Sequence, residues 1–218
     1  MKKEFKKRLL SSVILIPIAF FFIIQGSFFF NFFLLICFIF TSYEWSMMSK
    51  KKQYNIFGHL FLIFSFFCSY LIYNSGTSGF IYNSGIGLYN FLLILLICIS
   101  TDLGGYIFGK ILKGPKLTKI SPNKTYAGVF GGYLLTIIVL STYVSYNGQN
   151  FELENLILVI AISTISQIGD IIVSYFKRLS KVKDTGKIIP GHGGILDRTD
   201  GMIFAFPFAF ILVKFNLF

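Results

Sequence analysis

Long apolar runs alternate with short polar connections along the whole chain. The apolar runs cover residues 9–24, 28–45, 56–73, 86–101, 126–146, 153–176 and 201–218. Each run approaches the roughly 20 helical residues that cross a bilayer core about 30 Å thick, and a helix satisfies its own backbone hydrogen bonds in lipid. The pattern predicts seven transmembrane helices. The apolar but glycine-interrupted stretch 102–112 predicts a short or re-entrant eighth segment.

Composition supports this assignment. Hydrophobic residues make up 55% of the 218 residues and charged residues only 13%, whereas soluble domains carry about 25% charged residues. We therefore expect an all-α, polytopic integral membrane protein that forms one membrane-embedded domain over residues 1–218.

The positions of Lys and Arg predict the orientation of the chain in the membrane. Except for Lys214, every basic residue lies before the first span or in the second, fourth or sixth connection. Because basic residues near span ends stay on the cytoplasmic side, we expect a multi-pass protein of the cytoplasmic membrane with its N-terminus inside. The net charge of +11 then belongs to one membrane face and attracts anionic headgroups. Nucleic acid is not an expected partner, because the basic connections are short and lack interleaved aromatic residues.

Acidic residues are scarce, with nine in the chain, so each is informative. Glu44 lies at the end of a span and is expected to be an ordinary interfacial residue. Asp170 lies inside an apolar run, where a carboxylate is costly unless it faces a cavity, a cation or a partner. Ser174, Lys177 and Arg178 follow it at helical spacing on the same face. This face would suit a lipid phosphate with a metal ion bound beneath it.

Two further groups of residues share this chemistry. The stretch PGHGG, residues 190–194, supplies glycine N–H groups and a histidine that could contact an anion. Asp197 and Asp200 follow where the last helix should begin, so they could cap that helix or offer oxygen ligands of the kind that Mg²⁺ uses with phosphates. In the fourth connection, Asp102 and the stretch SPNKT, residues 121–125, form a second group suited to phosphates.

The stretch SYFKRLSKVKDTGKIIPGHGGILDRTD, residues 174–200, resembles the signature of the phosphatidate cytidylyltransferases, also called CDP-diacylglycerol synthases. The residues at the family's spacings are Ser174, Lys177, Arg178, Lys183, Asp184, Gly186, Pro190, His192, Gly193, Gly194, Asp197, Arg198 and Asp200. An upstream pattern also matches, through Asp102, Tyr106, Gly109, Lys110, Ser121, Pro122, Lys124, Thr125 and Gly128. The sequence departs from the family at Ala127 and Val173, where acidic residues are usual.

The resemblance implies transfer of the cytidylyl group of CTP to phosphatidic acid, giving CDP-diacylglycerol and pyrophosphate in phospholipid biosynthesis. It divides the chain into N-terminal hydrophobic spans, residues 1–100, and a catalytic half, residues 101–218, whose site faces the cytoplasm. It also implies Mg²⁺, together with a second, monovalent cation such as K⁺, held by Asp170 and Asp197. The candidate catalytic residues are Asp170, Lys177, Arg178, Asp197 and Arg198. The candidate substrate-binding residues are Asp102, Ser121, Lys124, Thr125, Ser174, Lys183, Asp184, His192, Gly193, Gly194 and Asp200.

Other functions stay open at this point. Intramembrane acids are also typical of ion-coupled transporters, although no internal repeat is visible. A CTP-dependent polyprenol kinase would release CDP instead of pyrophosphate. The residues Ala127 and Val173 would fit a catalytically weakened homologue. The sequence also leaves the oligomeric state open between a monomer and a homodimer.

Overall fold

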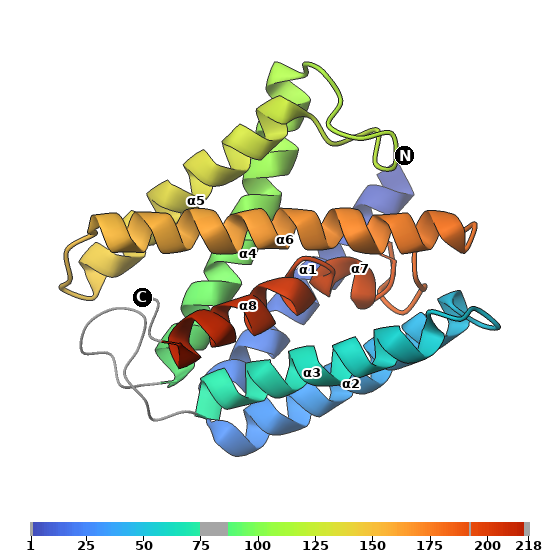
Figure 1. Cartoon of the computed structure of the whole chain (residues 1–218), viewed down its shortest axis with the longest axis horizontal. Helices are drawn as coiled ribbons and strands as arrows, with labels where there is room; N and C mark the ends of the chain where they lie inside the picture. Colours follow the sequence, from blue (N-terminus) through green and yellow to red (C-terminus); the bar gives the residue numbers. More distant parts are fainter. Residues whose placement is uncertain (1, 75–86, 192, 216–218) are drawn as a thin grey trace.

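The computed structural model describes residues 2–74, 87–191 and 193–215, and these residues form eight helices (Figure 1). The helices are α1 (Lys2–Ile24), α2 (Ser27–Met48), α3 (Asn55–Asn74), α4 (Gly87–Leu112), α5 (Tyr126–Tyr146), α6 (Leu153–Leu179), α7 (Leu196–Thr199) and α8 (Met202–Lys214). Outside them, the described residues contain two isolated β-bridges and no strand. The expected all-α class is confirmed.

The apolar runs correspond to helices, with differences in length. Five helices, α2 to α6, are long and apolar enough to cross a membrane, and two shorter apolar helices cover Val13–Ile24 and Met202–Lys214. The chain is therefore a multi-pass membrane protein. Its N-terminal orientation and its exact number of spans stay predictions.

The prediction of a separate eighth segment at residues 102–112 is wrong. Residues 102–112 continue α4 without a break, because each glycine inside a helix costs only about 1 kcal/mol relative to alanine. The last predicted span, 201–218, corresponds to α8, which begins at Met202 after the separate helical turn α7. Residues 216–218 of that span lie outside the described part of the chain.

The helices are arranged around α6 and α8 (Figure 1). Helix α8 packs against α3 on one side and α6 on the other, and α3 packs against α2. Helices α4 and α5 form the most extensive helix pair and both contact α6. A buried apolar core fills the space between these helices, with Phe30, Leu93, Ile94, Ile97 and Ile162 at its centre.

Glycines allow α4 and α5 to approach closely. A Cβ atom added at Gly128 of α5 would lie 2.8 Å from the carbonyl oxygen of Gly105 on α4, closer than real Cβ contacts. Gly104 similarly faces the backbone of Gly131. Close backbone approach through small residues is typical of helix pairs in membranes, and here it fixes the position of Asp102 relative to the start of α5.

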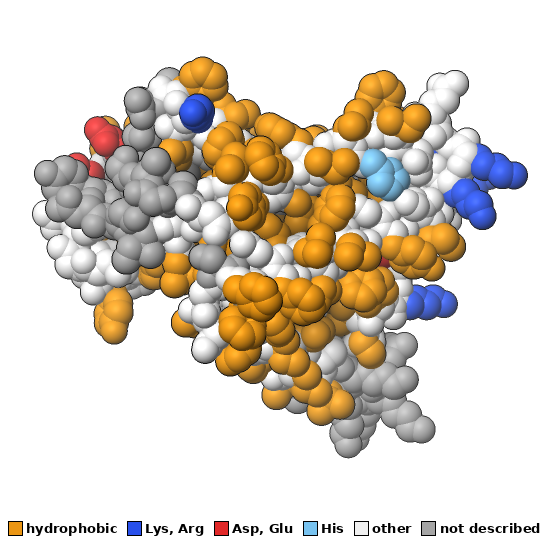
Figure 2. Space-filling model, turned by 90° about the horizontal axis from the view of Figure 1, so that it is seen from below, with side chains coloured by type: hydrophobic (Ala, Val, Ile, Leu, Met, Phe, Trp, Pro, Cys, Tyr) orange, Lys and Arg blue, Asp and Glu red, His pale blue; other side chains and the backbone are white. Residues whose placement is uncertain are grey.

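The basic connections lie at one end of the molecule. The α2–α3 connection and the segment after α6 lie at the same end in Figure 1. Figure 2 shows one face of the molecule, with apolar side chains over its middle and most of the visible Lys and Arg side chains at one end. This separation agrees with the expectation that basic connections share one membrane face.

Candidate functional site

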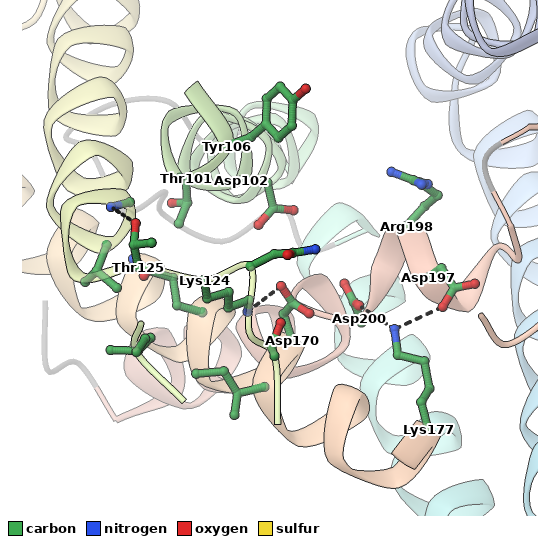
Figure 3. A pocket seen from close by; sticks show the side chains of 18 of the residues that line it. Thr101, Asp102, Tyr106, Lys124, Thr125, Asp170, Lys177, Asp197, Arg198 and Asp200 are labelled. Carbon is green, nitrogen blue, oxygen red and sulfur yellow. Dashed lines mark hydrogen bonds and ion pairs between the residues drawn. The ribbon is translucent and has the colours of Figure 1, made fainter. Parts of the chain in front are cut away.

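A cavity of about 410 Å³ opens between α4, α6, α7 and the α4–α5 connection (Figure 3). Ten of the predicted site residues line it: Asp102, Ser121, Lys124, Thr125, Asp170, Lys177, Asp184, Asp197, Arg198 and Asp200. They come from segments nearly 100 positions apart in the sequence. The structure therefore brings the two predicted groups of polar residues together in one place.

Helix α6 supplies the floor of the cavity. The hydroxyl of Ser174 donates to Asp170 Oδ1 at 3.3 Å, as the helical spacing predicted. The other carboxylate oxygen of Asp170 forms an ion pair with Lys124 from the α4–α5 connection. Asp170 thus links α6 to the α4–α5 connection, two segments that no sequence pattern connects.

Lys177 lies about two turns beyond Asp170 on α6 and pairs with two carboxylates. Its Nζ atom lies 3.0 Å from Asp197 Oδ1 and 3.6 Å from Asp200 Oδ2. Figure 3 shows Asp170 and Asp200 side by side, with Lys124 and Lys177 on either flank. Burial, followed by the charge of Asp170, raises the pKa of Asp200 well above its ordinary value, although Lys177 opposes this shift. The cavity is therefore crowded with negative charge that its own lysines only partly balance.

The segment after α6 is folded around Asp197. Its Oδ2 atom accepts hydrogen bonds from the backbone N–H groups of Thr185 and Gly194, both at 2.9 Å. Gly193 has a φ of +92° and no room for a Cβ, which would lie 2.8 Å from this same oxygen. Glycine is required there because other residues rarely adopt such a backbone conformation.

The α4–α5 connection covers the opposite side of the cavity. It folds back on itself through the pair Lys116 and Thr125, with the N–H of Leu117 donating to the carbonyl of Lys124 at 2.8 Å. The hydroxyl of Thr125 caps α5 by accepting from the N–H of Gly128 at 3.1 Å. This fold carries Lys124 over α6, and Asp102 points into the same space from α4 (Figure 3).

Several predicted residues have other positions. Arg178 is exposed and donates to the carbonyl of Val182, and Lys183 is exposed outside the cavity wall. Neither side chain lines the cavity. The N–H groups of Gly193 and Gly194, expected to bind phosphate, instead donate to Ile189 and Asp197. His192 lies outside the described residues.

The two unusual residues Ala127 and Val173 do not line the cavity. Val173 is buried in an apolar cluster with Trp45, Leu62 and Ile203. It precedes Lys177 by four residues, so it lies near the cavity side of α6, but the valine itself packs against this apolar cluster.

The structure also adds residues that the sequence reasoning missed. Thr101 and Gln167 line the cavity, as do Tyr106 and Asn123, which belong to the quoted motifs but were not among the candidate site residues. Gln167 precedes Asp170 by three residues, so the helical spacing used for Ser174 could have found it. The expectation that Glu44 is an ordinary interfacial residue is wrong, because only 2% of it is exposed. No local signal marked it, since its partners lie more than 140 residues away.

The carboxylates of the cavity fit a hard cation. Oxygen ligands suit Mg²⁺, which is usually bound by one or two carboxylates and completed by substrate phosphates and water. Within the described part of the chain, no group of three or more His, Cys, Asp or Glu side chains is close enough to hold an ion alone. The donor set therefore fits an ion that shares its coordination with a phosphate.

The sequence matches the model of a known protein family. A model of the family described as "Cytidylyltransferase family" matches residues 6–84 and 59–216. The chain belongs to this cytidylyltransferase family. The matched ranges include the helices α4, α6 and α7 that surround the cavity, as well as the N-terminal helices.

Curated relatives carry a more specific name. The chain is 45% identical over 129 residues to a phosphatidate cytidylyltransferase of Staphylococcus epidermidis, an alignment covering 58% of this chain and 50% of that protein. Proteins of the same name from Staphylococcus haemolyticus and Staphylococcus aureus are 43% identical over 129 and 131 residues, with the same coverage of each chain. The chain spans about half the length of the curated relatives it matches.

Proposed function

We propose that this cytidylyltransferase-family protein transfers the cytidylyl group of CTP to phosphatidic acid, giving CDP-diacylglycerol and pyrophosphate. The observation that carries the proposal is the cavity in which Lys124, Lys177 and Arg198 meet the carboxylates of Asp170, Asp197 and Asp200. The name of the staphylococcal relatives supports the same reaction. A cytoplasmic opening of the cavity agrees with the basic connections around it.

The reaction requires positioning more than proton transfer. The attacking group is a phosphate monoester, whose second pKa is about 6 by analogy with phosphoserine, so it is already an anion at neutral pH. One of its oxygens forms a bond to the α-phosphorus of CTP, and the bond from that phosphorus to the bridging oxygen breaks. Pyrophosphate leaves with this oxygen and the bonding electron pair. Alignment and charge neutralisation therefore provide most of the rate enhancement.

The lysines are placed to exchange partners when substrates bind. Lys124 and Lys177 now pair with Asp170, Asp197 and Asp200. An incoming triphosphate would compete for both lysines, and Arg198 lies at the cavity wall beside them. A guanidinium binds phosphate oxygens in a bidentate manner, so we assign Arg198 to a phosphate of CTP or of the lipid.

The carboxylates released by this exchange would hold Mg²⁺. Asp170 and Asp197 are the pair that the family resemblance implies, and Asp200, which the sequence also offered as an oxygen ligand, interacts with Asp170. A bound Mg²⁺ supplies charge neutralisation and orientation of phosphate oxygens. Asp102 points into the same space from α4, where it adds to the negative charge that attracts a cation.

The test is a mixed-micelle assay with CTP labelled at the α-phosphate, phosphatidic acid and Mg²⁺. We expect labelled lipid and unlabelled pyrophosphate to form in equal molar amounts, and both to be lost with EDTA or with Asp197→Asn. Glu154→Gln is the matched control, because Glu154 is exposed in the first turn of α6, at the end away from Lys177. Release of CDP with a phosphorylated lipid would assign kinase chemistry instead. Absence of turnover in folded protein would overturn the proposal.

A further inference from the structure

Glu44 is a buried carboxylate that the reaction described above does not use. It lies in the last turns of α2, is 2% exposed, and reaches across to the segment that leads into α7. Its Oε1 atom accepts from the N–H of Ile195 at 3.0 Å. Its Oε2 atom accepts from the N–H of Leu196 at 2.8 Å and from the hydroxyl of Thr185 at 3.1 Å.

These contacts explain how a charge is tolerated at this depth. Burial of a carboxylate is expensive unless hydrogen bonds or a cation compensate for the lost water. Among the ion pairs of the described residues, none involves Glu44. Two N–H groups and one hydroxyl of a single segment therefore stabilise Glu44. An acidic residue kept in a membrane span without a cation partner is more often functional than incidental.

Two glycines of the signature leave room for this carboxylate. A Cβ atom at Gly186 would lie 2.5 Å from Glu44 Oε1, and the three atoms nearest to that position all belong to Glu44. A Cβ at Gly194 would overlap both oxygens of the same carboxylate. The glycines at these positions therefore fit a side chain from the N-terminal half of the chain.

Thr185 connects Glu44 to the cavity. Its hydroxyl donates to Glu44, whereas its backbone N–H donates to Asp197 Oδ2. Glu44 also fixes the two residues immediately before Asp197, and Asp197 in turn pairs with Lys177. A shift of Glu44 would therefore be transmitted to Asp197 through both neighbouring backbone amides and through Thr185.

Other N-terminal residues support the same segment from its outer side. The hydroxyl of Ser11 on α1 donates to the carbonyl of Pro190 at 3.0 Å. Tyr54 and Ser180 share a hydrogen bond of 2.8 Å between their hydroxyl groups. These contacts are at the periphery, whereas Glu44 lies directly beneath the start of α7.

We infer that Glu44 is a positioning residue, which holds the start of α7 so that Asp197 and Arg198 have the correct geometry for the nucleotide and its cation. This inference rests on the proposed function, because it assigns Glu44 to the same reaction. Glu44 itself does not line the cavity, so its effect is indirect.

The variant Glu44→Gln tests the carboxylate with little change of shape. An amide has only one acceptor oxygen, so its NH₂ group would face the N–H of Leu196 or Ile195 and leave that donor without a partner. Thr185 can turn its hydroxyl, but a backbone N–H cannot. The start of α7 should therefore loosen while the helices remain packed.

We expect Glu44→Gln to lower kcat by about 10- to 100-fold, since small displacements of positioned groups have effects of this size. The Mg²⁺ concentration for half-maximal activity should rise several-fold, because Asp197 is displaced, whereas KM for phosphatidic acid should change little. Amide hydrogen exchange of residues 184–197 should become faster by roughly 5-fold, the factor that corresponds to the loss of one hydrogen bond of about 1 kcal/mol. Exchange in α5 should be unchanged. Glu154→Gln is the control for all four measurements.

The outcomes separate this inference from the proposed function. If the wild-type protein shows no cytidylyl transfer but exchange in residues 184–197 rises only in Glu44→Gln, the proposed function fails and the positioning by Glu44 stands. Unchanged kcat and unchanged exchange would overturn the inference. Faster exchange throughout the chain, with no change in Mg²⁺ dependence, would also overturn it by assigning Glu44 a general structural role. Thr185→Val provides a second variant, which removes only the hydroxyl donor and should produce smaller changes in the same direction.

Discussion

Lys177 provides the most direct test of the electrostatic arrangement in the cavity. Its side chain is 9% exposed and pairs with Asp197 and Asp200, whose side chains are 7% and 10% exposed. Substitution by methionine keeps the length of the side chain but removes its charge. Both carboxylates would then lack their lysine while remaining buried.

The expected cost follows from the distances. Unit charges 3.0 Å apart attract by about 5 kcal/mol at an effective dielectric constant of about 20, and desolvation of the pair cancels part of this amount. Removal of one partner of a buried pair typically costs about 3–5 kcal/mol, because the remaining charge is uncompensated. We expect Lys177→Met to lower the free energy of unfolding by about this amount. Such a loss is a large fraction of a typical total of about 5–15 kcal/mol.

The assay is denaturant unfolding of purified protein in micelles, with Lys183→Met as the control. Lys183 is an exposed lysine of the same region, so its substitution should change stability by no more than about 0.5 kcal/mol. The double variant Lys177→Met, Asp197→Asn should recover part of the loss, with a coupling energy of about 1–3 kcal/mol. A cost of Lys177→Met equal to that of Lys183→Met, or additive costs in the double variant, would refute the reasoning.

Three further predictions concern other parts of the site. Lys124→Gln should lower cytidylyl transfer by about 100-fold, whereas Lys119→Gln, which changes an exposed lysine of the same connection, should leave the rate within a few-fold in the same labelled-CTP assay. Ser174→Ala should reduce kcat by less than about 10-fold, because its 3.3 Å hydrogen bond to Asp170 is worth about 0.5–1.5 kcal/mol, and a loss of 1,000-fold would contradict this supporting role. Gly128→Ala should lower the free energy of unfolding by about 1–3 kcal/mol through overpacking against Gly105. The control is Gly105→Ala, whose Cβ would have no neighbour nearer than 3.7 Å and which should change this free energy by no more than about 1 kcal/mol. Equal effects of the two substitutions would show that the α4–α5 crossing is not tight.

The polar positions of α6 show how far sequence patterns reach. Asp170, Ser174 and Lys177 share one helix face because of the helical period. Asp170 and Lys177 line the cavity, whereas Ser174 is buried and is connected to it only through its hydrogen bond to Asp170. Arg178 follows Ser174 by four residues and so belongs to the same face, yet its side chain donates to the carbonyl of Val182. A helical face is broad, so spacing alone did not decide which of two adjacent cations enters the cavity.

The glycines of the signature show a different limit. Their presence predicted close approach to some group, and an anion of the substrate was the natural candidate. The structure instead assigns Gly193 to Asp197, and Gly186 and Gly194 to Glu44. Both interpretations require a carboxylate or phosphate oxygen near the backbone, so the residue type was informative while the identity of the partner was not.

The sequence by itself determined the all-helical membrane class, the positions of the main helices and most of the polar residues that line the cavity. It could do so because apolar length and helical period act locally along the chain. It also carried the family's signature. Only the tertiary structure decided that Lys124 meets Asp170, that Lys177 joins Asp197 and Asp200, and that Glu44 holds the start of α7. These pairings depend on how α2, α4, α6 and α7 pack against one another, and helix packing is set by side chains from distant segments that no local pattern connects.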